Sequence, residues 1–134
     1  MSGISPKLPL HTNDIDGAYV LNKTFKETTK QNLKNLVLTV KGERIMNPDF
    51  GAGIYELLFE QDTPFLAGEI SSRIQEQVSL YLPHVEIVDV AVGSTGASAA
   101  ADKTFALGPN VMTVVIKYRI PFINDSDQLD ITLE

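Results

Sequence analysis

Two glutamates four residues apart could do acid–base chemistry. Glu56 and Glu60 fall in a predicted helix, where residues at this spacing share one face with Cβ atoms about 6 Å apart. Retaining glycoside hydrolases hold two carboxyl groups about 5–5.5 Å apart, and Asp49 could contribute to such a site. A catalytic acid needs a pKa raised by burial, however, and no residue near these glutamates is an evident cause of that shift. The chain also has no Trp on which a sugar could stack, so we favour a structural role for the pair.

Other chemistry finds even less support. His11 and His84 are far apart in the sequence, and no triad or metal-ligand spacing surrounds either of them. The chain contains no Cys, which excludes a disulfide, a thiol nucleophile and a Cys-type metal site. No Gly-rich phosphate loop followed by Lys is present. The sequence therefore predicts no cofactor, no metal and no enzymatic activity.

Length and charge narrow the class of protein further. At 134 residues the chain is long enough for one domain with a modest core. A net charge of −6 argues against a nucleic-acid groove, which needs a basic stripe, and against an anionic membrane surface. No apolar run reaches the length of a transmembrane helix, and the N-terminus lacks the apolar core of a signal peptide. The composition therefore predicts neither nucleic acid nor membrane as a partner.

Residues 41–60 form a loop and a short helix around which the chain is organised. Pro48 fixes its own φ and moves the preceding residue out of the helical region, so the chain must turn there. Gly51 and Gly53 permit a positive φ or a close backbone approach. Ile45 and Met46 lie among these breakers, and apolar residues in a loop usually fill a core or meet a partner.

Two longer helices flank this loop. Residues 24–40 have Thr24 as the predicted N-cap and Glu27 as its capping-box partner, and 64–81 have an apolar stripe that ends before Pro83. Residues 1–22 show no period. They are either an extended arm that orders against neighbours or a frayed end without a role, and the residues alone leave both open. The predicted organisation is an arm over 1–22 and one domain over 23–134.

The second half of the chain predicts strands. Residues 85–92 have apolar side chains on both faces, which favours a central strand, and 111–122 alternate clearly. A loop rich in Gly, Ala and Ser over 93–110 separates them. A turn over 124–127 leads to a last strand over 129–133. The predicted class is α+β, with the N-terminal helices packed on one face of a small C-terminal antiparallel sheet.

Several motifs in register resemble one known family. They are Gly42-Glu43-Arg44, a Pro-acidic-Phe-Gly tetrad over 48–51, Leu-Phe-Glu over 58–60, and Thr63-Pro64 before the long helix. This order resembles the small baseplate wedge proteins of contractile-tailed phages, which have relatives in type VI secretion and related contractile injection systems. The resemblance covers nearly everything after about Asp14.

The resemblance implies a structural subunit of the baseplate in the virion tail, assembled in the host cytoplasm. Its partners would be larger wedge proteins and the tail sheath protein, with tail tube or hub proteins as further candidates. Members of the family carry Glu-Pro-Arg after the long helix, whereas this chain has Leu82-Pro83-His84, so docking there would rely on apolar packing. The residues implied in wedge docking are Pro48, Asp49, Phe50, Gly51, Leu57, Phe59, Leu82, Pro83 and His84.

The last predicted strand, over 129–133, is a candidate for pairing with strands of the sheath protein. A strand at a sheet edge leaves unpaired N–H and C=O groups to which another chain can add. The residues alone favour internal pairing, but the resemblance implies that the two last strands accept strands from the sheath and so initiate its assembly. The residues implied in this pairing are Val114, Ile116, Tyr118, Leu129, Ile131 and Leu133.

Two alternatives remain open from the sequence. The family has carried a lysozyme label, so one alternative is a peptidoglycan-degrading enzyme that uses Glu56 and Glu60. The other is a cytosolic adaptor on the same scaffold, because one bacterial branch of the fold regulates proteolysis by binding a partner.

Overall fold

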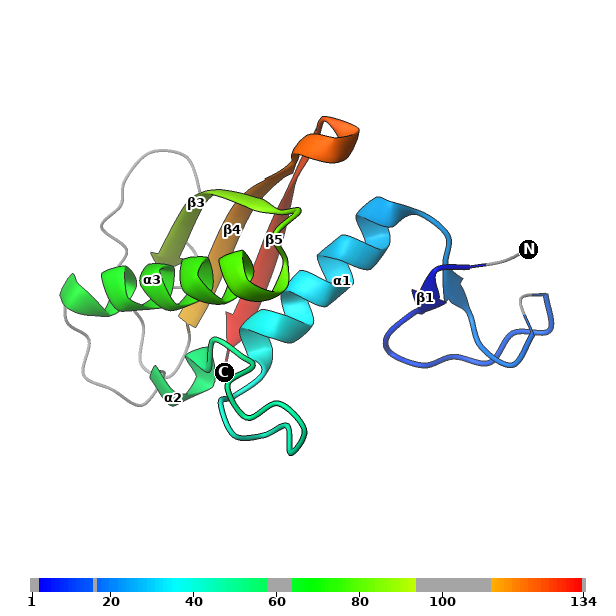
Figure 1. Ribbon diagram of the computed structural model, residues 1–134, viewed down its shortest axis with the longest axis horizontal. Helices are drawn as coiled ribbons and strands as arrows, with labels where there is room; N and C mark the ends of the chain where they lie inside the picture. Colours follow the sequence, from blue (N-terminus) through cyan, green and yellow to red (C-terminus); the bar gives the residue numbers. More distant parts are fainter. Residues whose placement is uncertain (1–2, 16, 58–63, 94–111, 134) are drawn as a thin grey trace. The chain divides into compact units, whose positions relative to one another are not determined.

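The computed structural model describes residues 3–15, 17–57, 64–93 and 112–133, which fall in two compact units, Met1–Asn35 and Leu36–Glu134 (Figure 1). The predicted residues Phe59 and Glu60, the predicted N-cap Thr63 and the Gly-rich loop lie outside the described residues, apart from the first residue of that loop.

The N-terminal unit contains a small hairpin. Strands β1 (Ser5–Pro6) and β2 (Leu21–Asn22) pair antiparallel, and the Ile4 N–H donates to the Asn22 carbonyl oxygen at 2.8 Å. Gln31 of the following helix holds the hairpin, because its Nε2 donates to the Pro6 carbonyl (2.9 Å) and its Oε1 accepts the Leu8 N–H (2.9 Å). Residues 3–22 therefore pair with themselves and with the helix of their own unit.

Helix α1 (Phe25–Leu38) begins and ends close to the prediction. Thr24 Oγ1 accepts the Glu27 N–H at 3.2 Å, and hydrogen bonds from Thr24 to the Glu27 side chain lower the pKa of that carboxyl. The capping box is therefore formed. One face of the helix is buried, and its buried residues are Thr29, Leu33, Leu36 and Val37.

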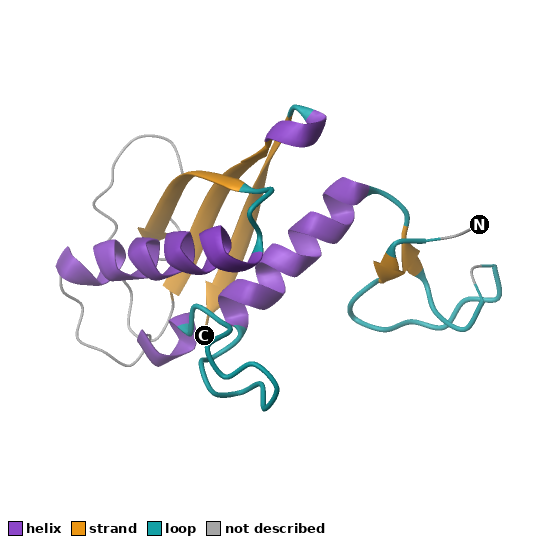
Figure 2. Cartoon of the chain, viewed as in Figure 1, coloured by secondary structure: helices purple, strands orange, loops and turns teal. Residues whose placement is uncertain are grey.

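The C-terminal unit combines two helices with one sheet (Figure 2). Helix α2 (Ile54–Leu57) contacts α3 (Pro64–Tyr81), and α3 packs against β3 (Glu86–Gly93) across a face of the sheet (Figure 1). Strands β4 (Met112–Ile120) and β5 (Asp125–Leu133) complete an antiparallel sheet in the order β3-β4-β5. The predicted α+β class is therefore confirmed.

The core of this unit follows the predicted periodicities. One face of α3 and one face of the sheet supply it, and every second residue of β4 points inward. The buried residues of these two elements are Leu66, Ile70, Ile74 and Val78 from α3 and Met112, Val114, Ile116, Tyr118 and Ile120 from β4. Among the described residues, no helix combines the length and apolar character needed to cross a lipid bilayer.

The prediction of a central strand over 85–92 is wrong, because β3 is an edge strand and β4 is central. A β-bulge explains the misleading pattern. Ile87 pairs with Tyr118 and Asp89 pairs with Lys117, so Val88 is an extra residue in the ladder and is 66% exposed. Beyond the bulge the alternation changes phase, which makes apolar residues seem to occupy both faces of a regular strand.

The end of the strand predicted over 111–122 and the turn predicted over 124–127 are also displaced. β4 ends at Ile120, because Pro121 has no N–H for the ladder and starts a 3₁₀ turn over Pro121–Ile123. Asn124 closes this turn in the left-handed region with φ 49°, and β5 begins directly afterwards at Asp125. Phe122 is therefore not on the buried face of a strand but is 85% exposed at the hairpin end.

Candidate functional site

The loop between α1 and α2 is held against the C-terminal end of α1. The Ala52 N–H donates to the Leu36 carbonyl oxygen (3.1 Å), and the Gly53 N–H donates to that of Thr39 (3.0 Å). These bonds satisfy carbonyl groups that a helix end leaves without intrahelical partners. Gly51 has φ 118°, and a Cβ there would collide with the Thr39 carbonyl oxygen. Both the conformation and the contact therefore require glycine at this position.

A buried amide holds the same loop from the other side. Gln77 of α3 is only 2% exposed, and its Oε1 accepts the Gly51 N–H at 3.0 Å. Gln77 is not among the residues predicted from the sequence. Its only signal is a polar side chain directly before Val78, a member of the buried stripe of α3. A buried amide in such a place has to find a hydrogen-bond partner.

Phe50 anchors the loop through its ring. The ring lies edge-on to Tyr81 with centroids 4.9 Å apart, and the Arg44 guanidinium sits 3.9 Å from the Phe50 centroid. The Tyr81 hydroxyl also donates to Asn47 Oδ1 at 3.2 Å. The Phe50 ring is thus in contact with two side chains, Arg44 from the loop itself and Tyr81 from the end of α3.

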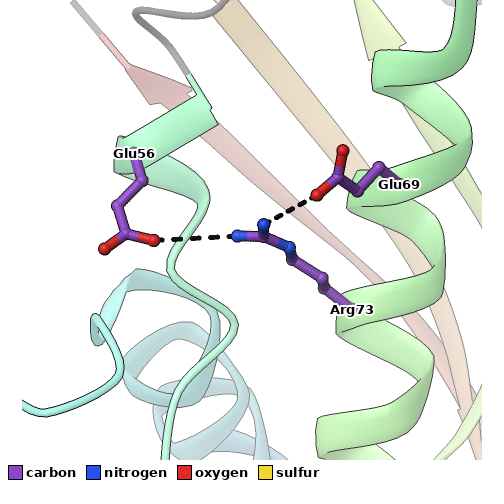
Figure 3. Close-up of polar contacts among 3 residues, drawn as sticks. All are labelled: Glu56, Glu69 and Arg73. Atoms are coloured by element: carbon purple, nitrogen blue, oxygen red, sulfur yellow. Dashed lines mark hydrogen bonds and ion pairs between the residues drawn. The ribbon is translucent and has the colours of Figure 1, made fainter.

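These contacts trace one line along α3. Glu69, Arg73, Gln77 and Tyr81 are spaced four residues apart, so they follow one another along one side of the helix. Arg73 bonds Glu69 at 2.7 Å and reaches Glu56 of α2 at 3.7 Å (Figure 3). One side of α3 therefore carries the contacts that hold both α2 and the loop.

The predicted docking residues divide into exposed and buried ones. Pro48, Asp49 and Pro83 are exposed, whereas Phe50 and His84 are half-buried. The buried members are Gly51, Leu57 and Leu82. Because Asn47 and Phe50 contact Tyr81, the structure brings the loop to the residue directly before Leu82. Two parts of the predicted docking set that are distant in sequence therefore lie close together.

The tip of the loop carries two apolar side chains that the docking prediction did not include. Ile45 and Met46 are 95% and 96% exposed. The sequence expectation was that apolar residues in this loop fill a core or meet a partner, and these two do not contribute to the core. The Gly42 N–H bonds the Pro48 carbonyl at 2.7 Å across the base of the tip, which gives the tip a defined shape.

The second candidate site is the sheet. All six residues predicted for strand pairing are buried on its inner face: Val114, Ile116, Tyr118, Leu129, Ile131 and Leu133. β4 pairs with β3 on one side and with β5 on the other, so both of its hydrogen-bonding edges are occupied. An incoming strand would therefore have to add to β3 or β5, with β4 as support.

The two edges of the sheet differ. β5 pairs with β4 over nine consecutive positions without a shift, whereas β3 carries the bulge at Val88. Within the described part of the chain, no strand pairs with the outer edge of either. Bulges at sheet edges hinder the addition of another strand. Of the two edges, β5 is therefore the more regular one.

Tyr118 links the inner face of the sheet to β5. Its hydroxyl lies 3.4 Å from Asp127 Oδ2. Burial raises the pKa of this phenol above its usual value, and the negative charges of Asp127 and Asp125 raise it further. Tyr118 therefore keeps its proton and donates a hydrogen bond from β4 to the Asp127 carboxylate of β5.

Of the two glutamates proposed for catalysis, the structure describes only Glu56. Glu60 lies outside the described residues, and the Glu56 side chain is 57% exposed and forms an ion pair with Arg73 (Figure 3). This is the setting of an ordinary surface contact between two helices. Across residues 3–57, 64–93 and 112–133, apart from residue 16, no cluster of three or more His, Asp or Glu side chains could hold a metal ion.

Comparisons with known proteins agree with the resemblance found in the sequence. A family model described as baseplate wedge protein gp25 matches residues 23–124. The baseplate wedge protein gp25 of Enterobacteria phage T4 is 29% identical over 92 residues, which are 68% of this chain and 66% of that protein. The match thus spans just under two thirds of that relative.

Three solved structures are similar in fold. A candidate tail lysozyme from Geobacter sulfurreducens superimposes with a TM-score of 0.66 and 24% identity, over 85% of this chain and 94% of that one. A chain of the anti-feeding prophage baseplate gives 0.56 and 20% identity, over 94% and 80%. A chain of the pyocin R2 baseplate after contraction gives 0.50 and 13% identity, over 93% and 98%.

Proposed function

The chain belongs to the family of baseplate wedge protein gp25, and on this premise we propose that it docks on larger wedge proteins and initiates the sheath by pairing β-strands. As a member it is a structural component of contractile tail systems, located in the baseplate of the virion. The partners, the docking residues and the step at the sheath are the proposal.

The proposed arrangement of the chain follows the sequence prediction. The arm is residues 1–22 and the wedge domain is residues 23–134, with the helices on one face of the sheet. The contact of α3 with β3 supports this arrangement. In the proposal, the helices cover one face of the sheet, the loop binds the wedge proteins, and the outer strand β5 binds the sheath protein.

The loop supports the wedge-docking half of the proposal. Pro48, Asp49 and Pro83 are exposed, and the contacts of Tyr81 connect the loop to the segment that precedes Pro83. A loop that is already ordered loses little conformational entropy when it binds. Phe50 and Gly51 would act by holding the loop in shape, and the buried Leu57 and Leu82 would support it from below.

The nine-residue regular edge strand β5 is the observation that carries the sheath half. Its inner side chains are anchored in the core, so the strand offers its backbone in a fixed position. Main-chain hydrogen bonds supply the affinity in such β-augmentation. The bulge at Val88 leaves the opposite edge the poorer acceptor.

A cysteine cross-linking experiment tests the sheath half directly, because the chain has no native Cys. Thr132→Cys places a thiol on an exposed position of β5, and Val88→Cys places a matched thiol on the exposed bulge of β3. Each variant is mixed with sheath protein carrying single cysteines along its strand-exchanging segments, and the mixture is oxidised. We expect a specific cross-link from Thr132→Cys and none from Val88→Cys.

The control outcomes separate the parts of the proposal. Cross-linking at Val88→Cys alone would mean that the wrong edge was chosen, and equal yields from both variants would mean non-specific contact. Deleting β5 is the poorer experiment, because Leu129, Ile131 and Leu133 belong to the core and the truncated chain would unfold.

We further propose that the chain is not an enzyme, although one solved structure of similar fold is described as a candidate tail lysozyme. The exposed ion pair of Glu56 with Arg73 supports a structural role for this carboxylate. Purified chain should not clear a suspension of peptidoglycan. Clearing that is lost in Glu56→Gln would establish the enzyme, and recovery of the chain only with a cytosolic protein, never with tails, would favour the adaptor.

A further inference from the structure

The N-terminal hairpin is an ordered structure with almost no apolar core of its own. Between residues 3 and 35, the described residues that are buried are Asn22, Thr28, Thr29 and Leu33, and only the last is apolar. Hydrogen bonds supply the order instead. The Lys7 N–H donates to the Val20 carbonyl at 2.9 Å, and Asn22 Nδ2 donates to both Gln31 Oε1 (3.0 Å) and Ser5 Oγ (3.2 Å).

The apolar side chains of this hairpin point into solvent. Ile15 is 82% exposed, and four others are about half exposed: Ile4, Leu8, Leu10 and Tyr19. Scattered exposed apolar residues are ordinary, but here every large apolar side chain of a 20-residue segment except two, Val20 and Leu21, is in this state. The hairpin holds in place a surface that would be stabilised by burial against another molecule.

The charge of the segment indicates the kind of surface that would cover it. Residues 1–22 contain one Lys and two Asp, so their side chains carry a formal charge of only −1 within a chain of net charge −6. Neither a basic nor an acidic partner would be selected by such a segment. An apolar groove on a protein fits it better.

Two of the structural matches extend into this segment. Residues 23–134 are 112 of the 134 residues, about 84% of the chain. Matches covering 94% and 93% must therefore reach into roughly a dozen or more of the first 22 residues, and both come from assembled baseplates. The family model starts only at residue 23.

From these observations we propose that the hairpin of residues 3–22 is a second docking element, which binds an apolar groove on a neighbouring baseplate protein through Ile15, Leu10 and Leu8. This inference rests on the proposed function, because it places the groove in the same assembly. It adds a contact that the wedge-docking loop does not supply.

The test compares two matched substitutions for binding to a purified wedge complex, assembled from the other wedge proteins of the same tail. Ile15→Glu introduces a charge on the hairpin, and Phe122→Glu introduces the same charge at an equally exposed position far along the chain. Both side chains are exposed, so both variants should unfold at the temperature of the unchanged chain. We expect Ile15→Glu to weaken binding about tenfold or more and Phe122→Glu to change it less than twofold.

The outcomes distinguish the failure of this inference from that of the proposed function. Binding by the unchanged chain with equal affinity for Ile15→Glu would overturn the hairpin proposal and leave wedge docking intact. Lack of binding by the unchanged chain would refute wedge docking itself. Light scattering of the chain alone identifies the other occupant: a dimer that Ile15→Glu dissociates would show that the hairpin binds a second copy and not a neighbour.

Discussion

Substitution of Gly51 by Ala should destabilise the chain far more than the same substitution at Gly42. Both glycines have a positive φ, 118° and 89°, so Ala is strained at either position. They differ in their surroundings. A Cβ at Gly42 would have no atom within 4 Å, whereas a Cβ at Gly51 would collide with the Thr39 carbonyl oxygen.

The structure sets the size of the difference. Ala in a left-handed conformation costs about 1–2 kcal/mol at either glycine. The collision at Gly51 must additionally displace the hydrogen bonds from Gly51 to Gln77 and from Gly53 to Thr39. Each such bond contributes about 0.5–1.5 kcal/mol to the free energy of unfolding, so Gly51→Ala should cost about 1–3 kcal/mol more than Gly42→Ala. The gain from a less flexible unfolded chain is common to both variants and cancels.

Urea denaturation followed by circular dichroism measures this difference, with the slope m unchanged if only the native state is affected. Binding of both variants to the wedge complex then tests whether the proposed docking depends on the shape of the loop. If the two substitutions lower the free energy of unfolding equally, the close approach of Gly51 to Thr39 does not hold the loop in its shape.

Three further predictions concern single groups. Gln77→Leu should leave the buried Gly51 N–H without an acceptor and lower the free energy of unfolding by about 1–3 kcal/mol, whereas Leu at the exposed Gln75 should change it by no more than about 0.5 kcal/mol in the same denaturation assay. Tyr118 keeps its proton to higher pH in the folded chain than in the unfolded one, so the free energy of unfolding should fall as pH rises above about 10. Thermal unfolding measures this decline as a lower unfolding temperature, and Tyr118→Phe should not show it. Thr24→Ala should remove the cap of α1, lower the free energy of unfolding by about 0.5–2 kcal/mol and reduce the helical signal. The pKa of Glu27 is lowered in the folded state. In the unsubstituted chain, the stabilisation by that carboxylate should therefore be lost as pH falls below the usual range of Glu.

The helices could be predicted from the sequence because their signals are local. The capping box at Thr24 and the i, i+4 repeat of Ile70 and Ile74 fix where each helix starts and which face is buried. The strict alternation of β4 likewise predicted its buried face. These patterns depend only on residues within one or two turns, or on near neighbours in a strand.

Other features could not be predicted because they depend on pairing between distant residues. The bulge at Val88 appears only when Ile87 and Asp89 are aligned with β4, so a pattern read with a strict period of two assigns the wrong faces. In the candidate site, Pro48 and Gly51 predicted the loop. Gln77 could not be predicted, because its role comes from a hydrogen bond to Gly51, which lies 26 residues away in the sequence. The displaced start of β5 has the same cause, since three residues that resemble a turn belong to the ladder with β4.

The bulge of β3 has a consequence for stoichiometry. If both edges of a sheet can accept strands, molecules can pair one after another without an end, and such growth produces fibres rather than closed particles. A sheet with one regular edge can take up a single strand and then has no acceptor left. If β5 is that edge, each copy of this chain would start one column of sheath, and the number of columns would be set by the number of copies in the baseplate.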